Sequence, residues 1–185
     1  MMRLTGLLIG VGVFLTACSA GSVSIAEYAT AVEERAAIYA TESGDLTERH
    51  LATLEGSITR IQGEMDGEAL VDAAIGETAR ETTKLFAGIS DALDQYARDL
   101  DATAPPAAVS DEHRAYIGAL DTSRAGLASV LEDLPGATSF EEIDRIISGS
   151  GFADAQQRVE TACRNLEDRI KAQGPEVDIR CEATR

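Results

Sequence analysis

Residues 24–39 read SIAEYATAVEERAAIY, and this stretch decides the fold class. Ser24 stands three residues before Glu27, the spacing of a capping box, in which each side chain bonds a backbone N–H that the start of a helix leaves unpaired. Apolar residues then recur at intervals of three and four, the period of a helix with one buried face: Ile25, Tyr28, Ala29, Val32, Ala36 and Tyr39. The stretch predicts an amphipathic helix that extends to about Ser43.

Breaks in the same pattern divide the following residues into further helices. Gly44-Asp45 predicts a turn, and the helix expected after it has a narrow apolar seam made by Leu51, Leu54, Ile58, Ile61 and Met65. Asp66-Gly67 precedes a third segment, residues 70–100, which fits either one long helix or two. Pro105-Pro106 ends that segment, because the residue before a proline is pushed out of the helical region.

The remaining helices begin at clear start signals. One begins at Ser110 and ends before Pro135-Gly136. A short one opens with a second capping box, Ser139 to Glu142, and the last begins at Phe152. Five or six amphipathic helices joined by short turns predict an all-α, up-and-down helical bundle that forms a single domain over residues 25–185.

The last helix and the tail carry two cysteines that can pair. Cys163 lies on the apolar stripe of the helix, and Gly174-Pro175 stops that helix 11 residues later. The helix would climb about 16 Å between these points, while an extended return to Cys181 can span about 23 Å. We therefore expect a Cys163–Cys181 disulfide that tethers the tail, with Val177 and Ile179 facing the helix. The alternative is two unpaired, buried thiols.

The N-terminus has the features of an export signal. Arg3 precedes a run of 14 mostly apolar residues, Leu4 to Ala17, which is shorter than the roughly 20 that a membrane-spanning helix needs. Residues 1–17 are therefore expected to be a signal peptide that is removed. Leu15-Thr16-Ala17-Cys18 resembles the lipobox of bacterial lipoproteins, which implies that Cys18 becomes the lipid-attached first residue and residues 18–24 a short tether. The alternative is an ordinary secretory signal that ends near a cysteine.

Charge restricts the classes of partner. The chain has a formal net charge of −16, which opposes binding to nucleic acid and to anionic lipid surfaces. Membrane contact would then come from acyl chains on Cys18, and two such chains suffice for stable anchoring. The acidic excess fits a solvated helical surface or, as the alternative, a reservoir for cations.

Motifs for catalysis are missing from the sequence. The Glu-x-x-His, His-Glu-x-x-His, EF-hand, Walker and Gly-x-Ser-x-Gly patterns do not occur, so we expect a protein that is not an enzyme and has no cofactor or metal centre. The two histidines, His50 and His113, lie on apolar stripes near the predicted starts of their helices. In an up-and-down order these two helices begin at the same end, which suggests a weak ligand or cation site or a pH-sensitive cap. The alternative is two partly buried histidines with ordinary hydrogen bonds.

The four tyrosines allow two interpretations. Tyr28 and Tyr39 are 11 residues apart and so share a helix face, and Tyr96 and Tyr116 complete the set. They could line a groove for a small ligand. The alternative is that they lie at the edge of the core with their hydroxyl groups in water.

Residues from Pro105-Pro106 through His113-Arg114 to the two paired cysteines resemble small exported helical lipoproteins of actinobacterial type. Two functions follow as expectations. The first is a lipid-anchored, non-catalytic interaction or structural module of the cell envelope, which faces away from the cytoplasm and meets another envelope protein through an exposed helical face. The second is an envelope protein that binds a small ligand or a cation.

Overall fold

The computed structural model describes residues 23–184, so the predicted signal peptide and Cys18 lie outside the described residues. The elements in chain order are α1 (Ile25–Glu64), α2 (Gly67–Asp101), the 3₁₀ turn η1 (Ala107–Val109), α3 (Ser110–Asp133), η2 (Leu134–Gly136), α4 (Phe140–Gly149), α5 (Phe152–Lys171) and η3 (Cys181–Thr184). Within these residues there is no strand, and no helix combines the length and apolarity needed to cross a bilayer.

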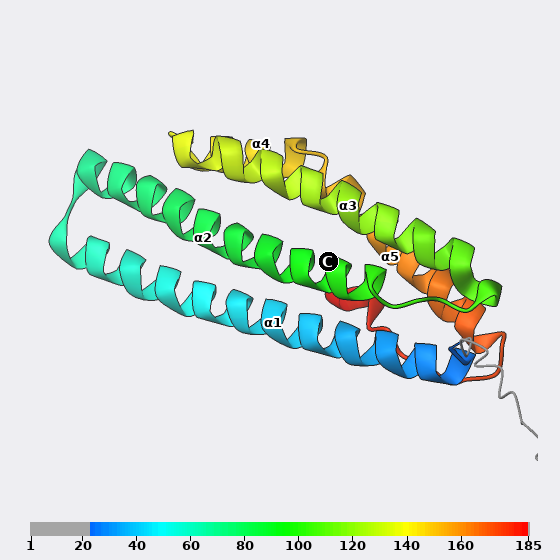
Figure 1. The fold of residues 1–185 in the computed structure, drawn as a ribbon. Coiled ribbons are helices and arrows are strands. Elements are labelled where there is room, and N and C mark those ends of the chain that lie inside the picture. The colour runs from blue at the N-terminus through cyan, green and yellow to red at the C-terminus, as the bar shows by residue number, and fades with distance from the viewer. Residues whose placement is uncertain (1–22, 185) are drawn as a thin grey trace, which may run out of the picture.

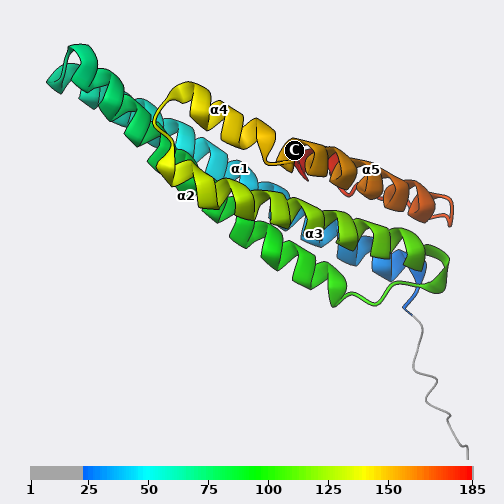
Figure 2. The same ribbon diagram turned by 90° about the horizontal axis from the view of Figure 1, so that it is seen from above.

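The helices form the predicted all-α, up-and-down bundle (Figure 1). Helices α1, α2 and α3 alternate in direction, and the fourth position is filled by α4 followed by α5, which run the same way (Figure 2). The break between α4 and α5 falls at Gly151, whose φ of +73° belongs to the left-handed region that glycine adopts without strain.

The turn expected at Gly44-Asp45 is wrong, because α1 continues through it for 40 residues. A glycine inside a helix costs only about 1 kcal/mol relative to alanine. Packing on both sides of this point outweighs that cost: the Tyr39 ring stacks on a tyrosine of α2, and Leu46 packs over Gly88. The third segment is likewise one helix, α2.

Several helix ends agree with the signals in the sequence. Ser24 and Glu27 form the expected capping box, with the carboxylate accepting from the Ser24 N–H at 2.9 Å. The second box is only half formed: Ser139 accepts from the Glu142 N–H at 3.1 Å, but the Glu142 carboxylate accepts from the N–H and hydroxyl of Thr138. The start of α4 therefore uses one more residue than the motif predicts.

The core lies along the bundle axis and stops before the far end of the α1–α2 hairpin. Its larger part joins α1, α2, α3, α5 and the tail around fully buried residues that include Tyr28, Val32, Leu100, Tyr116, Leu120, Leu127 and Leu166. A smaller part joins α2 to the end of α3 and to α4 through Ile75, Ala79, Val130, Leu134 and Ile143.

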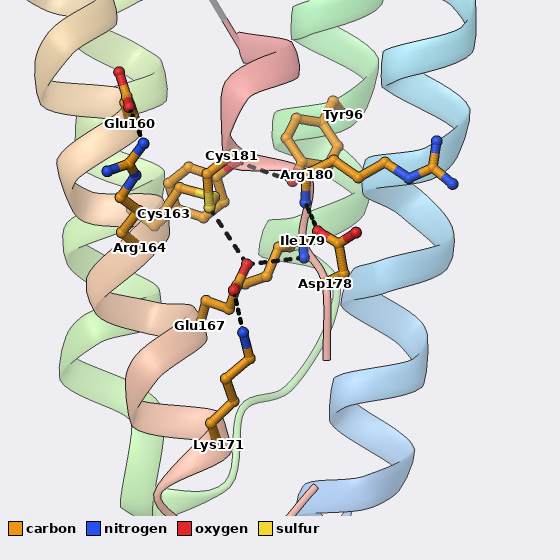
Figure 3. The surroundings of a disulfide bond; sticks show 11 residues. Tyr96, Glu160, Cys163, Arg164, Glu167, Lys171, Asp178, Ile179, Arg180 and Cys181 are labelled. Atoms are coloured by element: carbon orange, nitrogen blue, oxygen red, sulfur yellow. Dashed lines mark hydrogen bonds and ion pairs between the residues drawn. A yellow bond between two sulfur atoms is a disulfide. The ribbon is translucent and has the colours of Figure 1, made fainter. Parts of the chain in front are cut away.

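The C-terminal tail returns over the bundle as predicted and is held by the Cys163–Cys181 disulfide, whose Cα atoms are 5.6 Å apart (Figure 3). Val177 and Ile179 are buried, whereas Asp178 and Arg180, which alternate with them, are exposed. The tail forms no strand ladder. Instead the Glu167 carboxylate of α5 accepts the Ile179 N–H at 3.1 Å, and this bond holds the extended segment on the helix.

The α1–α2 hairpin extends past the ends of α3 and α4 (Figures 1 and 2). At 1.5 Å per residue, α1 is about 60 Å long and α3 only about 36 Å. The end of the hairpin therefore consists of α1 and α2 alone, without the contacts to α3, α4 and α5 that cover these two helices in the rest of the fold.

Candidate functional site

The two histidines do not share a site. His113 lies in the first turn of α3, where its Nδ1 and the Tyr28 hydroxyl share a hydrogen bond of 2.7 Å. His50 lies 22 residues farther along α1 than Tyr28, about 33 Å away, beside Glu81 and Lys84 of α2. The prediction that both histidines lie at one end is wrong, because it counted α1 as two helices. Among residues 23–184 no group of histidine, cysteine and carboxylate side chains has the arrangement of a metal site.

The tyrosines lie inside the bundle, not at its edge with their hydroxyls in water. All four are nearly or fully inaccessible. The hydroxyls of Tyr96 and Tyr116 share a hydrogen bond of 3.0 Å, and the Tyr39 and Tyr96 rings stack with their centroids 5.0 Å apart. Burial raises the pKa of Tyr39 to about 12 and raises the pKa values of the other three further. The cluster is therefore uncharged at neutral pH and ties α1, α2 and α3 together.

Beside Tyr39 the bundle contains a cleft with a volume of about 590 Å³. Four separate segments form it: the middle of α1, the middle of α2, the first turn of α5, and η3. The residues that define its character are Tyr39, Glu48, Phe86, Phe152, Gln156 and Glu182. This volume lies within the roughly 300–1,000 Å³ range of small-molecule sites.

The chemistry of the cleft differs between its walls and its mouth. Phe86 and Phe152 meet edge to face with ring centroids 5.9 Å apart and supply an apolar wall. The exposed carboxylates Glu48 and Glu182 stand at the mouth, and among residues 23–184 no lysine, arginine or histidine lines the cleft. The cleft offers apolar contacts, a hydroxyl group and negative charge, and these features suit the binding of a small ligand.

Sequence reasoning identified Tyr39 as one of a set of possible groove residues but missed the rest of the cleft. Phe86 and Phe152 each fit an ordinary core stripe, and Glu182 lies in a tail whose path depends on the disulfide. No local signal connects these three residues, since 30 to 96 positions separate them.

A second feature is the apolar seam on the outer half of α1, made by Leu51, Leu54, Ile58, Ile61 and Met65, which we call the outer seam. Helix α2 covers it incompletely: Ile61 is buried, but Leu51 is 59% exposed and Met65 is 44% exposed. Val71, in the second turn of α2 at the same end of the hairpin, is 50% exposed. Residues 51–74 also carry five carboxylates and one basic residue, so the surroundings of the seam are acidic.

Known proteins provide no assignment for either feature. No protein-family model, curated protein or solved structure matches this chain.

Proposed function

We propose that this protein is a lipid-anchored, non-catalytic interaction module of the cell envelope, and that the outer part of the α1–α2 hairpin is its docking surface. The observation that supports the docking role is the outer seam. Within residues 51–65 only Ile61 is buried, although the sequence places five apolar residues at core spacing there. A third helix laid along the hairpin would cover the seam as α3 and α5 cover the rest of the bundle.

Charge indicates what kind of partner fits. The hairpin end has five carboxylates, at Glu55, Glu64, Asp66, Glu68 and Asp72, against the single base Arg60. Two copies of this surface would repel each other, whereas a helix with apolar residues flanked by lysine or arginine would be attracted. The partner we propose is such a basic amphipathic helix on another envelope protein.

The lipid anchor supports the same role through geometry. Cys18 lies seven residues before α1, so the bundle would begin close to the membrane. Helix α1 is about 60 Å long, and an upright bundle would hold the docking surface at roughly that distance from the lipid. Such an arrangement suits a partner whose binding segment lies well outside the bilayer.

Photocrosslinking in intact cells tests the docking surface. A photoreactive amino acid is placed at Leu51 or at Val71, and the matched control places it at Gln157, which is also exposed, on α5. We expect one discrete adduct from both hairpin positions and none from the control. A charge reversal at Glu64 and Glu68 should reduce the yield, because electrostatic attraction contributes to the encounter.

Three outcomes would contradict the proposal. Equal labelling at Gln157 would show that contact with the hairpin is not selective. An adduct of twice the protein's own mass would identify a second copy in place of a basic partner. Absence of any adduct from both hairpin positions in cells that make the protein would remove the docking role.

A further inference from the structure

The cleft beside Tyr39 has a hydroxyl group that is available to a ligand. Tyr28, Tyr96 and Tyr116 each use their hydroxyl in a hydrogen bond inside the bundle. Within residues 23–184 the Tyr39 hydroxyl has no hydrogen-bond partner, although the residue is only 4% exposed. Because Tyr39 borders the cleft, a polar atom bound there would be able to form a hydrogen bond with this hydroxyl.

The walls of the cleft indicate that the main part of a ligand would be apolar. Phe86, Ile89 and Phe152 present apolar side chains from two helices, and the two rings are perpendicular. Gln156, one turn after Phe152 on α5, is held in place because its Oε1 accepts a hydrogen bond of 3.1 Å from Ser123. An apolar or aromatic group of a few carbon atoms would pack against the phenylalanine side of this cleft.

The carboxylates at the mouth of the cleft determine which ligand charge is favoured. Glu48 and Glu182 are the ionisable groups that line the cleft together with Tyr39, so a cation would be attracted and an anion repelled. The faces of aromatic rings also favour a cation. Glu182 directly follows Cys181, so the disulfide holds one of these two carboxylates in position.

We propose that this cleft binds a small organic cation, an amine or ammonium compound with an apolar body, through the Tyr39 hydroxyl, the Phe86 and Phe152 rings and the carboxylates of Glu48 and Glu182. This site is separate from the docking surface on the hairpin end, and it involves different residues. A cell-envelope protein with such a cleft would bind amine-containing small molecules outside the cytoplasm.

The test uses three probes of similar size that differ in charge. Phenethylamine is the cation, 2-phenylethanol the neutral analogue and 3-phenylpropionate the anion, and each is titrated into the purified full chain with ligand-observed NMR. We expect saturable binding in the order cation, neutral, anion, with the cation up to about 5-fold tighter than the alcohol, since a partly exposed ion pair contributes up to about that factor. Tyr39→Phe removes only the hydroxyl, and we expect the amine to bind about 3- to 10-fold more weakly to this variant.

Matched variants separate the local charges from the overall charge. Glu48→Gln combined with Glu182→Gln should abolish the preference for the amine over the alcohol. Glu55→Gln, on the same helix but away from the cleft, should preserve it. Binding of 3-phenylpropionate as tightly as phenethylamine, no saturation by any probe up to about 10 mM, or no effect of Tyr39→Phe would each overturn the proposal. Thermal unfolding of each variant verifies that it is folded.

Discussion

Lowering the pH below about 6.5 should destabilise the protein through His113. The side chain is 6% exposed, and its Nδ1 shares a hydrogen bond with the Tyr28 hydroxyl. Burial lowers the pKa of His113 from the ordinary value of 6.5, and the nearby Asp101 opposes this only in part. The folded protein therefore binds a proton at His113 less readily than the unfolded chain does, and its stability falls as the pH drops through 6.5.

The size of the effect follows from linkage. A group that is neutral in the folded protein and charged in the unfolded chain changes the free energy of unfolding by about 1.4 kcal/mol per pH unit in the affected window. Between pH 7.5 and pH 5.5 the loss from His113 has an upper limit of about 1.4 kcal/mol, which applies if the side chain stays neutral in the folded protein throughout this window. Staying above pH 5.5 keeps the titration of most carboxylates out of the measurement.

Guanidinium unfolding at several pH values measures this loss. The comparison is made in a His50→Gln background, so that His113 is the remaining histidine. His113→Gln should flatten the dependence between pH 7.5 and pH 5.5. Tyr28→Phe should lower stability by about 1 kcal/mol at every pH and leave most of the slope, since burial is the larger cause. A slope unchanged by His113→Gln would refute the assignment.

Two further predictions concern packing. Replacing Cys163 and Cys181 together by serine should cost about 3 kcal/mol in equilibrium unfolding, because the bridge closes a loop of 18 residues; a loss below about 1 kcal/mol would show that the tail is held by other contacts. Gly118→Ala should stabilise α3 by up to about 1 kcal/mol, since nothing lies within 4 Å of the added methyl group. In contrast, Gly126→Ala should destabilise, because the methyl group would lie 3.0 Å from the Phe152 Cα, and equal melting temperatures for the two variants would contradict this close approach.

Local sequence signals predicted the helix ends correctly wherever no tertiary contact opposed them. The start of α1 depends on the Ser24 capping box, and the stop before Pro105-Pro106 depends on prolines that act within a few residues. Helix α3 begins at Ser110 as expected, although no side chain caps it. Gly44-Asp45 failed as a turn because glycine is only weakly unfavourable in a helix, and contacts with α2 decided the outcome. Helix propensity depends on the local sequence alone, so it does not take account of contacts between α1 and α2.

That one error also misplaced the histidines. Counting α1 as two helices reverses the direction assigned to the second half, so His50 was expected beside His113 when it lies in the middle of the hairpin. The cleft could not be predicted for another reason. Its walls come from three helices and a tail, and the register that brings Phe86 to Phe152 depends on packing across the whole bundle.

The most direct test of the proposed function is the intact mass of the protein extracted from the membranes of cells that make it. The proposal predicts a chain that begins at Cys18 and carries diacylglyceryl on the sulfur, and it predicts that Cys18→Ala releases the protein from the membrane fraction. A mature chain with an unmodified thiol at that position, or one that keeps residues 1–17, would contradict the anchor and with it the role at the cell envelope.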